Sequence, residues 1–187
     1  MEDAVKDYEE YIKEDAEELS YHDKLTLVTI AGSGGKSKAT RIQKLGLIIN
    51  AIKEGKTPSS HEPYFYGGFS DNIEESLSYL LDSGLIKKIG TEYTITEYGK
   101  KVLKFLETNN DEVYHTLKDI VDKIMPSFRR LKDDELVLLT YILFPELTEK
   151  SLIKEDMEKS PLKNKIEKIL KKGKLGDIDI YFLKSRE

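Results

Sequence analysis

The stretch FSDNIEESLSYLLDSGLIKKIGTEYTITEYGKKVLKFL, residues 69–106, decides the fold. Apolar residues recur at steps of three and four through its first third, which predicts a helix over residues 70–83. The alternating side chains that follow predict a β-hairpin over residues 85–96. Thr96 has the side chain of a helix cap and predicts a further helix after the hairpin. The sequence therefore predicts helix, tight hairpin and helix in immediate succession.

Two short signatures carry this pattern. They are Leu77-x-x-Leu80-Leu81-x-x-Gly84-Leu85-Ile86 and Tyr93-x-Ile95-Thr96-x-x-Gly99. Together they resemble the winged-helix superfamily, which includes many transcription regulators. Two further motifs, Arg41-Ile42-Gln43-Lys44-Leu45 and Tyr66-Gly67-Gly68-Phe69-Ser70, are similar to those of the YwgA-like group of uncharacterised prokaryotic proteins, where proline often replaces Gly68. The resemblance implies a winged helix-turn-helix, a fold that serves both DNA binding and protein interaction.

The rest of the chain reads mainly as helix. We expect a fold that is mainly α with a small β-hairpin wing: a winged helix-turn-helix plus a C-terminal helical segment. Its parts are an acidic leading helix (1–21), a winged-helix domain (22–108) and a helical segment (109–187). Periodicity predicts helices over 3–19, 22–31, 38–53, 113–124, 135–144, 151–157 and 161–172, with loops at 32–35 and 57–68 and a strand or tail at 178–182. Ser70 and Ser160 are predicted caps, and Pro126 is predicted to end a helix.

Composition excludes several classes of protein. The chain has no cysteine, which removes disulfides and thiolate chemistry, and no apolar run long enough for a membrane span. The acidic N-terminus is unlike a secretory signal, so we expect a cytoplasmic protein. His22, His61 and His115 lack metal-ligand spacing, and no nucleophile motif occurs. We therefore expect a non-enzyme with no catalytic residues, no cofactor and no metal.

One glycine-rich segment invites a nucleotide-binding interpretation. Residues 31–37 read AGSGGKS, but the phosphate-loop motif needs a glycine where Ile30 stands and a strand before the loop. Residues 22–31 read as helix instead. We interpret the segment as a turn between helices, and a basic loop that touches a nucleic-acid phosphate through Lys36 and Lys38 stays open.

The net charge of −5 is unevenly distributed. Residues 1–20 carry nine acidic side chains against Lys6 and Lys13, so the remainder is slightly basic. The helix 70–83 exposes four acids and no basic residue, which opposes the usual insertion of this helix into the major groove. A wing-led mode with lysines on phosphates fits the basic residues better. The predicted contacts with double-stranded DNA are Lys36, Lys38, Arg41, Lys44, Asn72, Ser76, Lys87, Lys88, Lys100 and Lys101.

Other interpretations remain for the same residues. The lysines, including a third cluster over 163–174, can equally form a solvated face. The acids of 3–19 or 70–83 can bind a protein partner, which would make the chain an antitoxin-like module or a complex-assembly adaptor, and a homodimer is possible. The aromatic run Tyr64-Phe65-Tyr66 is either a stacking platform for bases or, more commonly for such clusters, part of the core.

Overall fold

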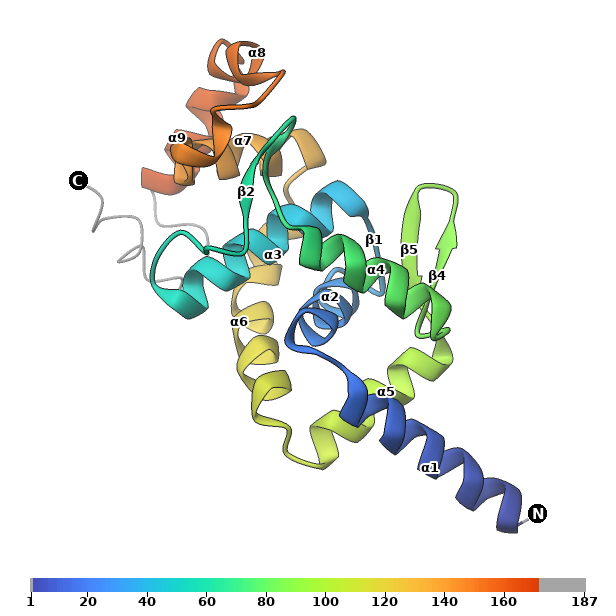
Figure 1. Cartoon of the computed structure of the whole chain (residues 1–187). Coiled ribbons are helices and arrows are strands. Elements are labelled where there is room, and N and C mark those ends of the chain that lie inside the picture. The colour runs from blue at the N-terminus through green and yellow to red at the C-terminus, as the bar shows by residue number, and fades with distance from the viewer. Residues whose placement is uncertain (1, 172–187) are drawn as a thin grey trace. The chain divides into compact units, whose positions relative to one another are not determined.

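The computed structural model describes residues 2–171 (Figure 1). The fold is mainly helical with small antiparallel sheets, as predicted. Its contacts divide the described chain into two compact units. The first unit contains residues 2–38 and 72–119, and the second contains residues 39–71 and 120–171. Each unit is thus assembled from two separate segments of the chain.

The first unit combines helices with a three-stranded antiparallel sheet. Its elements are α1 (Glu2–Glu18), α2 (Tyr21–Gly32), β1 (Lys36–Lys38), α4 (Asp71–Asp82), β4 (Ile86–Ile89), β5 (Glu92–Ile95), α5 (Glu97–Thr108) and the start of α6 (Glu112–Phe128). The strands lie in the order β1-β5-β4. The predicted hairpin is therefore confirmed, and it gains a third strand.

Local sequence explains most boundaries around the hairpin. Ile73, Leu77 and Leu80 form the buried stripe of α4. Gly84 then ends the helix with φ 71°, a left-handed conformation that glycine adopts without steric cost. Thr96 caps α5 as predicted, because its Oγ1 accepts a hydrogen bond from the Gly99 N–H.

Strand β1 is a feature that the sequence analysis missed. Its residues Lys36, Ser37 and Lys38 lack the apolar alternation of a strand, and residue 38 was predicted to begin a helix. The pairing comes from β5, where Ser37 lies opposite Tyr93. Ser37 and Tyr93 are both buried, so the strand is held by a partner distant in sequence rather than by its own propensity.

Helix α1 packs along α5, as Figure 1 shows. Ile12, Ala16 and Leu19 on its apolar stripe are buried. At the polar edge, the Tyr98 hydroxyl donates to Asp15 Oδ2 at 2.5 Å. The predicted amphipathic helix is confirmed at these buried residues, whereas Tyr8, which the same spacing assigns to the stripe, is 40% exposed.

Helix α2 is the buried centre of the first unit. Ser20 and Asp23 form a reciprocal capping box at its start. Lys24 lies almost fully inside, and its Nζ is 2.6 Å from Asp111 Oδ2. Asp111 also accepts from the Tyr114 N–H, so this carboxylate both neutralises a buried lysine and caps α6.

The second unit is built around α3 and α7. Its elements are α3 (Ala39–Glu54), β2 (Glu62–Tyr64), β3 (Gly67–Phe69), the remainder of α6, α7 (Asp133–Leu143), η1 (Pro145–Thr148), α8 (Lys154–Glu158) and α9 (Leu162–Lys171). Helices α3 and α7 pack against each other, and β3 contacts both. Ser160 accepts from the Leu162 N–H and caps α9 as predicted.

The prediction that residues 57–68 form a loop is wrong in part. Strands β2 and β3 pair antiparallel within it. A Cβ at Gly67 would lie 2.5 Å from the ring of Tyr141, and one at Gly68 would lie 2.8 Å from Leu147 Cδ1. The two glycines therefore let this hairpin approach α7 and η1 closely, a requirement that appears only in tertiary structure.

Two hydrogen bonds between Gln43 and Ser70 join the motifs at residues 41–45 and 66–70. The Gln43 side-chain amide donates to the Ser70 carbonyl at 3.0 Å and accepts from the Ser70 N–H at 2.9 Å. The backbone of Ser70 is thus held, whereas its buried hydroxyl has no hydrogen-bond partner. The prediction that the Ser70 side chain caps the next helix is therefore wrong.

Helix α6 also differs from its prediction. Pro126 lies inside it, and the helix continues to Phe128. Proline removes one backbone donor, but Met125 and Phe128 are both buried, and their burial favours completing the last turn. The predicted strand or tail at 178–182 and the lysines at 172 and 174 lie outside the described residues.

Candidate nucleic-acid interface

The sheet of the first unit brings basic residues from two distant segments together. Lys36 on β1 lies opposite Thr94 on β5, and Thr94 lies opposite Lys87 on β4. The next row on the same face joins Lys38, Glu92 and Ile89. Side chains alternate between the faces of a sheet, so these rows share one face. Lys36, Lys38 and Lys87 are all exposed there.

One carboxylate interrupts this face. Glu92 Oε2 is 3.1 Å from Lys36 Nζ, and both side chains remain substantially exposed. An ion pair in solvent contributes little, of order 0–1 kcal/mol, so a phosphate can compete for Lys36. The face as a whole carries three lysines and one acid. We name it the lysine face, meaning Lys36, Lys38, Lys87, Ile89, Glu92 and Thr94.

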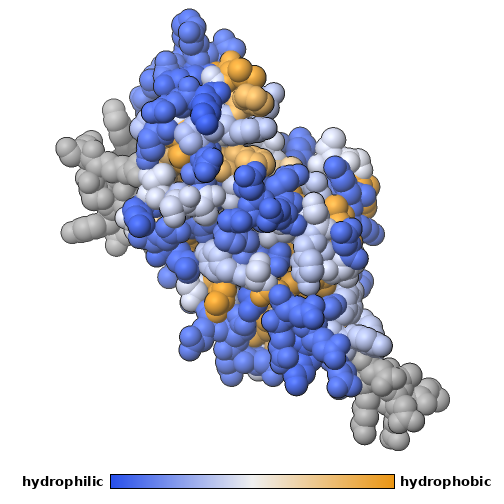
Figure 2. All heavy atoms as spheres, in the orientation of Figure 1, coloured by the Kyte–Doolittle hydropathy of each residue, from blue (hydrophilic) through white to orange (hydrophobic). Residues whose placement is uncertain are grey.

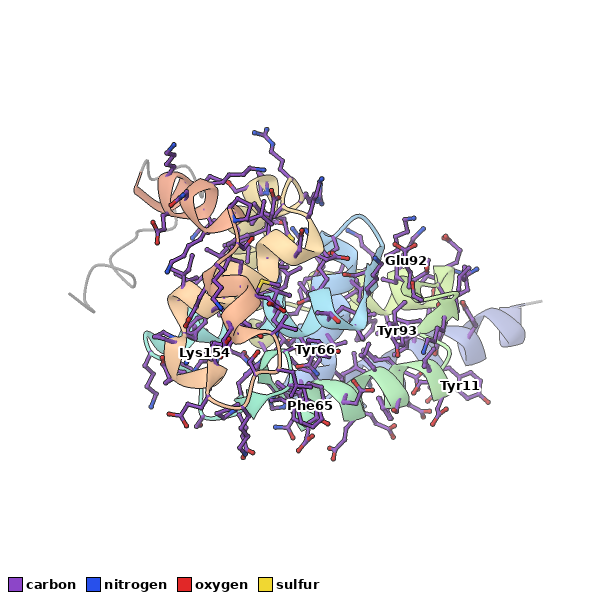
Figure 3. All side chains as sticks on the ribbon, turned by 90° about the horizontal axis from the view of Figure 1, so that it is seen from above. Tyr11, Phe65, Tyr66, Glu92, Tyr93 and Lys154 are labelled. Atoms are coloured by element: carbon purple, nitrogen blue, oxygen red, sulfur yellow. The ribbon has the colours of Figure 1, made fainter. Side chains whose placement is uncertain are left out.

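The opposite face of the sheet is apolar. Tyr93, the neighbour of Glu92, points the other way and is buried with Ile86 and Ile95 (Figure 3). Lys88 follows the same alternation but remains exposed, with Nζ 5.2 Å from the centroid of the Tyr93 ring. Strand alternation therefore places Lys88 on the side of the sheet opposite the lysine face, where it contacts the Tyr93 ring.

Lys100 and Lys101 on α5 are exposed and already have partners. Lys100 Nζ is 2.6 Å from Glu97 Oε1. Lys101 Nζ lies 4.6 Å from the centroid of the Tyr8 ring and 3.3 Å from the Tyr8 hydroxyl oxygen. Lys101, a predicted phosphate contact, is therefore already in contact with Tyr8 of the acidic helix α1.

Arg41 and Lys44 are not the exposed cations that the sequence suggested. The Arg41 guanidinium donates to the backbone carbonyls of Phe128 at 2.5 Å and Leu131 at 2.9 Å, and it lies 3.3 Å from Asp133. It joins α3 to the segment between α6 and α7. Both residues belong to the second unit, whereas the lysine face belongs to the first.

Lys44 is buried, with 3% of its surface exposed. Its Nζ donates to the Gly68 carbonyl at 2.9 Å. Burial lowers the pKa of Lys44 to about 8, because desolvation disfavours the charged amine. The burial of Lys44 could not be predicted from the sequence, because lysines on an amphipathic helix normally face the solvent.

The surface of α4 matches its predicted charge. Asp71, Glu74, Glu75 and Asp82 are exposed, and the helix carries no basic residue. Asn72 is exposed beside them, but Ser76 is buried at 3% and is removed from the possible base contacts. The electrostatic objection to major-groove insertion of α4 thus applies to the folded chain.

The glycine-rich turn at 32–35 does not have phosphate-loop geometry. A helix, α2, precedes it, and the strand β1 follows it. The Gly34 N–H donates to Ala31 O and the Gly35 N–H to Ile30 O, so both amides bond within the chain. A phosphate loop instead needs a preceding strand and free amides aimed at the ligand.

The third lysine cluster is partly structural. Lys165 on α9 forms an ion pair with Glu135, which is buried at the start of α7. The hydrogen bond from Lys165 is the largest cause of a lowered pKa at Glu135. Glu135 also accepts from the Lys132 N–H and so caps α7. This lysine contributes to the packing of α9 and is not a free surface charge.

Exposed aromatic residues lie on the β2–β3 hairpin of the second unit. Tyr64, Phe65 and Tyr66 are 46%, 47% and 54% exposed, so the interpretation that they belong to the core is wrong. The Tyr64 ring lies 4.6 Å from that of Phe65 and 4.9 Å from that of Phe69. Phe65 and Tyr66 are labelled in Figure 3. Elsewhere, the face drawn in Figure 2 is mostly hydrophilic, with hydrophobic residues in small groups.

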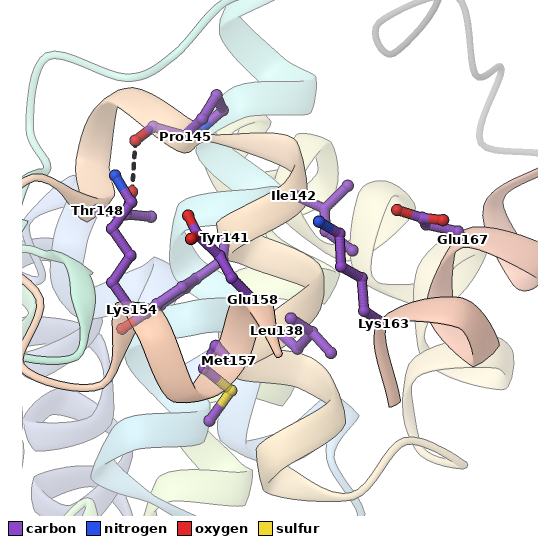
Figure 4. Close-up of a pocket in the computed structure, with 10 residues that line it drawn as sticks. All are labelled: Leu138, Tyr141, Ile142, Pro145, Thr148, Lys154, Met157, Glu158, Lys163 and Glu167. Atoms are coloured by element: carbon purple, nitrogen blue, oxygen red, sulfur yellow. Dashed lines mark hydrogen bonds between the residues drawn. The ribbon is translucent and has the colours of Figure 1, made fainter. Parts of the chain in front are cut away.

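A pocket of about 340 Å³ opens in the second unit (Figure 4). Its apolar wall comes from α7, with Leu138, Tyr141 and Ile142. The charged residues at the pocket are Lys154, Glu158, Lys163 and Glu167. Two lysines and two glutamates balance, so the lining shows no preference for a ligand of either charge.

In residues 2–171, the side chains also bear on metal binding and on membrane insertion. No group of three or more histidine, cysteine, aspartate or glutamate side chains is placed to hold a metal ion there. Within the same residues, no helix has both the length and the apolar composition of a membrane span. Comparisons with protein-family models, curated proteins and solved structures find no match.

Proposed function

We propose that this chain is a winged-helix protein that binds double-stranded DNA, as a transcription regulator does, through phosphate contacts of its lysine face. The observation that carries the proposal is the pairing of β1 with β5. It places Lys36 and Lys38 on the same exposed face as Lys87, across the intervening strand β5, although these residues lie in segments far apart in the chain. Clustered exposed lysines are the electrostatic requirement for binding a duplex.

The order of elements supports the winged-helix assignment. Along the chain, α2, β1, α3 and α4 are followed by the hairpin of β4 and β5, and β1 joins that hairpin as the third strand. The direct succession of α4, the β4–β5 hairpin and α5 is the pattern on which the winged-helix resemblance depends. The β2–β3 hairpin, inserted between α3 and α4, is an addition to that pattern.

The charge of α4 determines the mode of binding. Four exposed acids on this helix would meet phosphates at the edges of the major groove and repel them. The wing-side lysines carry no such penalty, so the sheet approaches the backbone and α4 stays outside the groove. Contacts of this kind position a protein on DNA without reading its sequence.

A binding titration tests the proposal. Fluorescence anisotropy with a labelled duplex of mixed sequence, at about 50 mM salt, should give micromolar affinity that falls steeply as salt rises. The double variant Lys36→Glu/Lys87→Glu should bind at least about tenfold more weakly, and each lost lysine should reduce the salt slope by about one. Its matched control is Lys159→Glu/Lys168→Glu, two exposed lysines of the second unit. Absence of binding, or equal losses in both variants, would exclude the lysine face.

The acidic surface of α4 favours a second candidate function. A protein-interaction module, antitoxin-like or an adaptor in a complex, would present these acids to a basic partner and would not bind DNA. Affinity capture from the native host, comparing the parent chain with a Glu74→Lys/Glu75→Lys variant, separates the two. A partner retained by the parent and lost by the variant supports the module, and light scattering of the purified chain tests the predicted homodimer.

A further inference from the structure

A groove of about 430 Å³ lies in the first unit, and its lining includes none of the residues of the lysine face. It is bounded by the turn after α2, by the end of β5, by α5 and by the start of α6. Its volume is in the range of sites that bind small organic molecules. All of its residues belong to one unit, and none of the comparisons assigns it a role.

The floor of the groove is apolar. Ile95, Leu103 and Tyr114 line it, and each side chain is less than a tenth exposed. One wall is the backbone of Gly34 and Gly35, which have no side chains to fill the space. No atom lies within 4 Å of the position that a Cβ at Gly34 would occupy. A flat or aliphatic group can therefore contact the floor and the glycine wall together.

The rim of the groove is predominantly cationic. Lys100 and Lys104 reach it from α5 and Lys118 reaches it from α6, against the single carboxylate of Glu107. Glu107 Oε2 is 2.9 Å from Lys104 Nζ. Lys104, Lys118 and His115 all lower the pKa of Glu107, so several cations converge on this one acid.

The ion pairs already present on the rim do not prevent binding. The Lys100 partner, Glu97, has a side chain that is 85% exposed, and the Lys104–Glu107 pair is also open to solvent. Exposed pairs of this kind contribute little. A ligand that rests on the apolar floor gains burial in addition to charge, so it competes well for these lysines.

We propose that this groove binds a small organic anion, in which an apolar body carries a carboxylate, sulfonate or phosphate group. The body occupies the floor of Ile95, Leu103 and Tyr114. The acidic group lies at the rim between Lys100, Lys104 and Lys118. The site does not depend on DNA binding, because its geometry is complete within α2, β5, α5 and α6.

The probe for the test is 8-anilinonaphthalene-1-sulfonate, which has an aromatic body and one sulfonate and fluoresces when its environment becomes apolar. Titration into the full chain should give saturable binding of one probe per chain. In a ¹⁵N-labelled sample, the shifted amide signals should include Gly34, Gly35 and Leu103. The same titration with N-phenyl-1-naphthylamine, which lacks the sulfonate, should give at least about tenfold weaker binding.

Three variants measure how the charged residues of the rim contribute to probe binding. Lys100→Gln/Lys104→Gln should weaken probe binding by about tenfold, because it removes two rim cations without changing the floor. Glu107→Gln should strengthen binding by about threefold, because it removes the competing carboxylate. The matched control, Lys154→Gln/Lys163→Gln, alters the charged pocket of the second unit and should leave binding unchanged.

The two changes of opposite sign make the test decisive, since loss of folding would weaken binding in every variant. Equal affinity for the neutral analogue, signal shifts confined to α7–α9, or weaker binding by Glu107→Gln would each overturn the proposal. Failure here leaves the DNA titration unaffected, because the probe experiment contains no nucleic acid.

Discussion

At the scale of single residues, Lys44 shows how far a side chain can depart from its expected role. Its position on α3 suggested a phosphate contact, yet it is buried and donates to the Gly68 carbonyl. Among residues 2–171, no carboxylate forms an ion pair with the Lys44 amine. Its hydrogen bond to Gly68 only partly offsets the desolvation of the amine. Lys44 therefore contributes to the position of β3 at a cost in stability.

This cost predicts a pH dependence. The folded chain releases the Lys44 proton near pH 8, whereas the unfolded chain holds it to about pH 10.5. Between these values the unfolded state binds more protons, so the free energy of unfolding should rise with pH, by roughly 3 kcal/mol at most. Urea unfolding at several pH values measures it.

The variant Lys44→Met should lose most of that rise. The control Lys53→Met changes an exposed lysine of the same helix and should retain it. All other side chains are shared by the three proteins, so their contributions cancel in the comparison. Parallel pH profiles for the parent and Lys44→Met would contradict the assignment.

At the scale of elements, the fold explains why glycine occupies the last position of the motif Tyr93-x-Ile95-Thr96-x-x-Gly99. A Cβ at Gly99 would lie 2.2 Å from the carbonyl oxygen of Leu85. No side-chain rearrangement relieves a contact with backbone, so the start of α5 would have to move away from the residue that leads into β4. The glycine permits the close approach of helix and hairpin.

The variant Gly99→Ala should therefore lower the free energy of unfolding by about 3 kcal/mol, although alanine normally favours a helix. Thermal and urea unfolding measure the loss. Glu97→Ala, at an exposed position in the first turn of α5, is the control and should change stability far less than Gly99→Ala does. A stabilised Gly99→Ala protein would show that the contact is absent.

At the scale of the whole molecule, the proposed binding of DNA depends on charge. The chain carries a net charge of −5, and the acidic helix α1 belongs to the same unit as the lysine face. Long-range repulsion from these acids should weaken attraction of the duplex, and salt should screen it.

Replacing Glu9, Glu10, Glu14 and Glu18 with glutamine should therefore strengthen duplex binding about threefold or more at low salt, with the gain disappearing above about 0.3 M salt. These positions are exposed, so the fold should persist. The control makes the same change at Glu146, Glu149, Glu155 and Glu158 of the second unit. An equal gain from both sets would show that net charge matters and that the position of α1 does not.

Many of the helices and the β4–β5 hairpin follow from local sequence signals. Periodicity placed α1, α2, α3 and α5, and alternation with Gly84 and Thr96 placed the β4–β5 hairpin, because these signals act over one or two turns of the chain. The acidic surface of α4 was also evident, since it follows from helix geometry alone.

Tertiary structure decided the rest. Strand β1 exists because β5 offers it a partner, and Lys44 and Ser76 are buried because other elements cover them. The anion groove likewise joins a glycine turn to lysines many residues away. Such features depend on contacts between distant segments, and a sequence pattern records only what lies within one segment. The lysine face depends on both. The sequence supplies its lysines, and the pairing of β1 and β4 with β5 places them on one face.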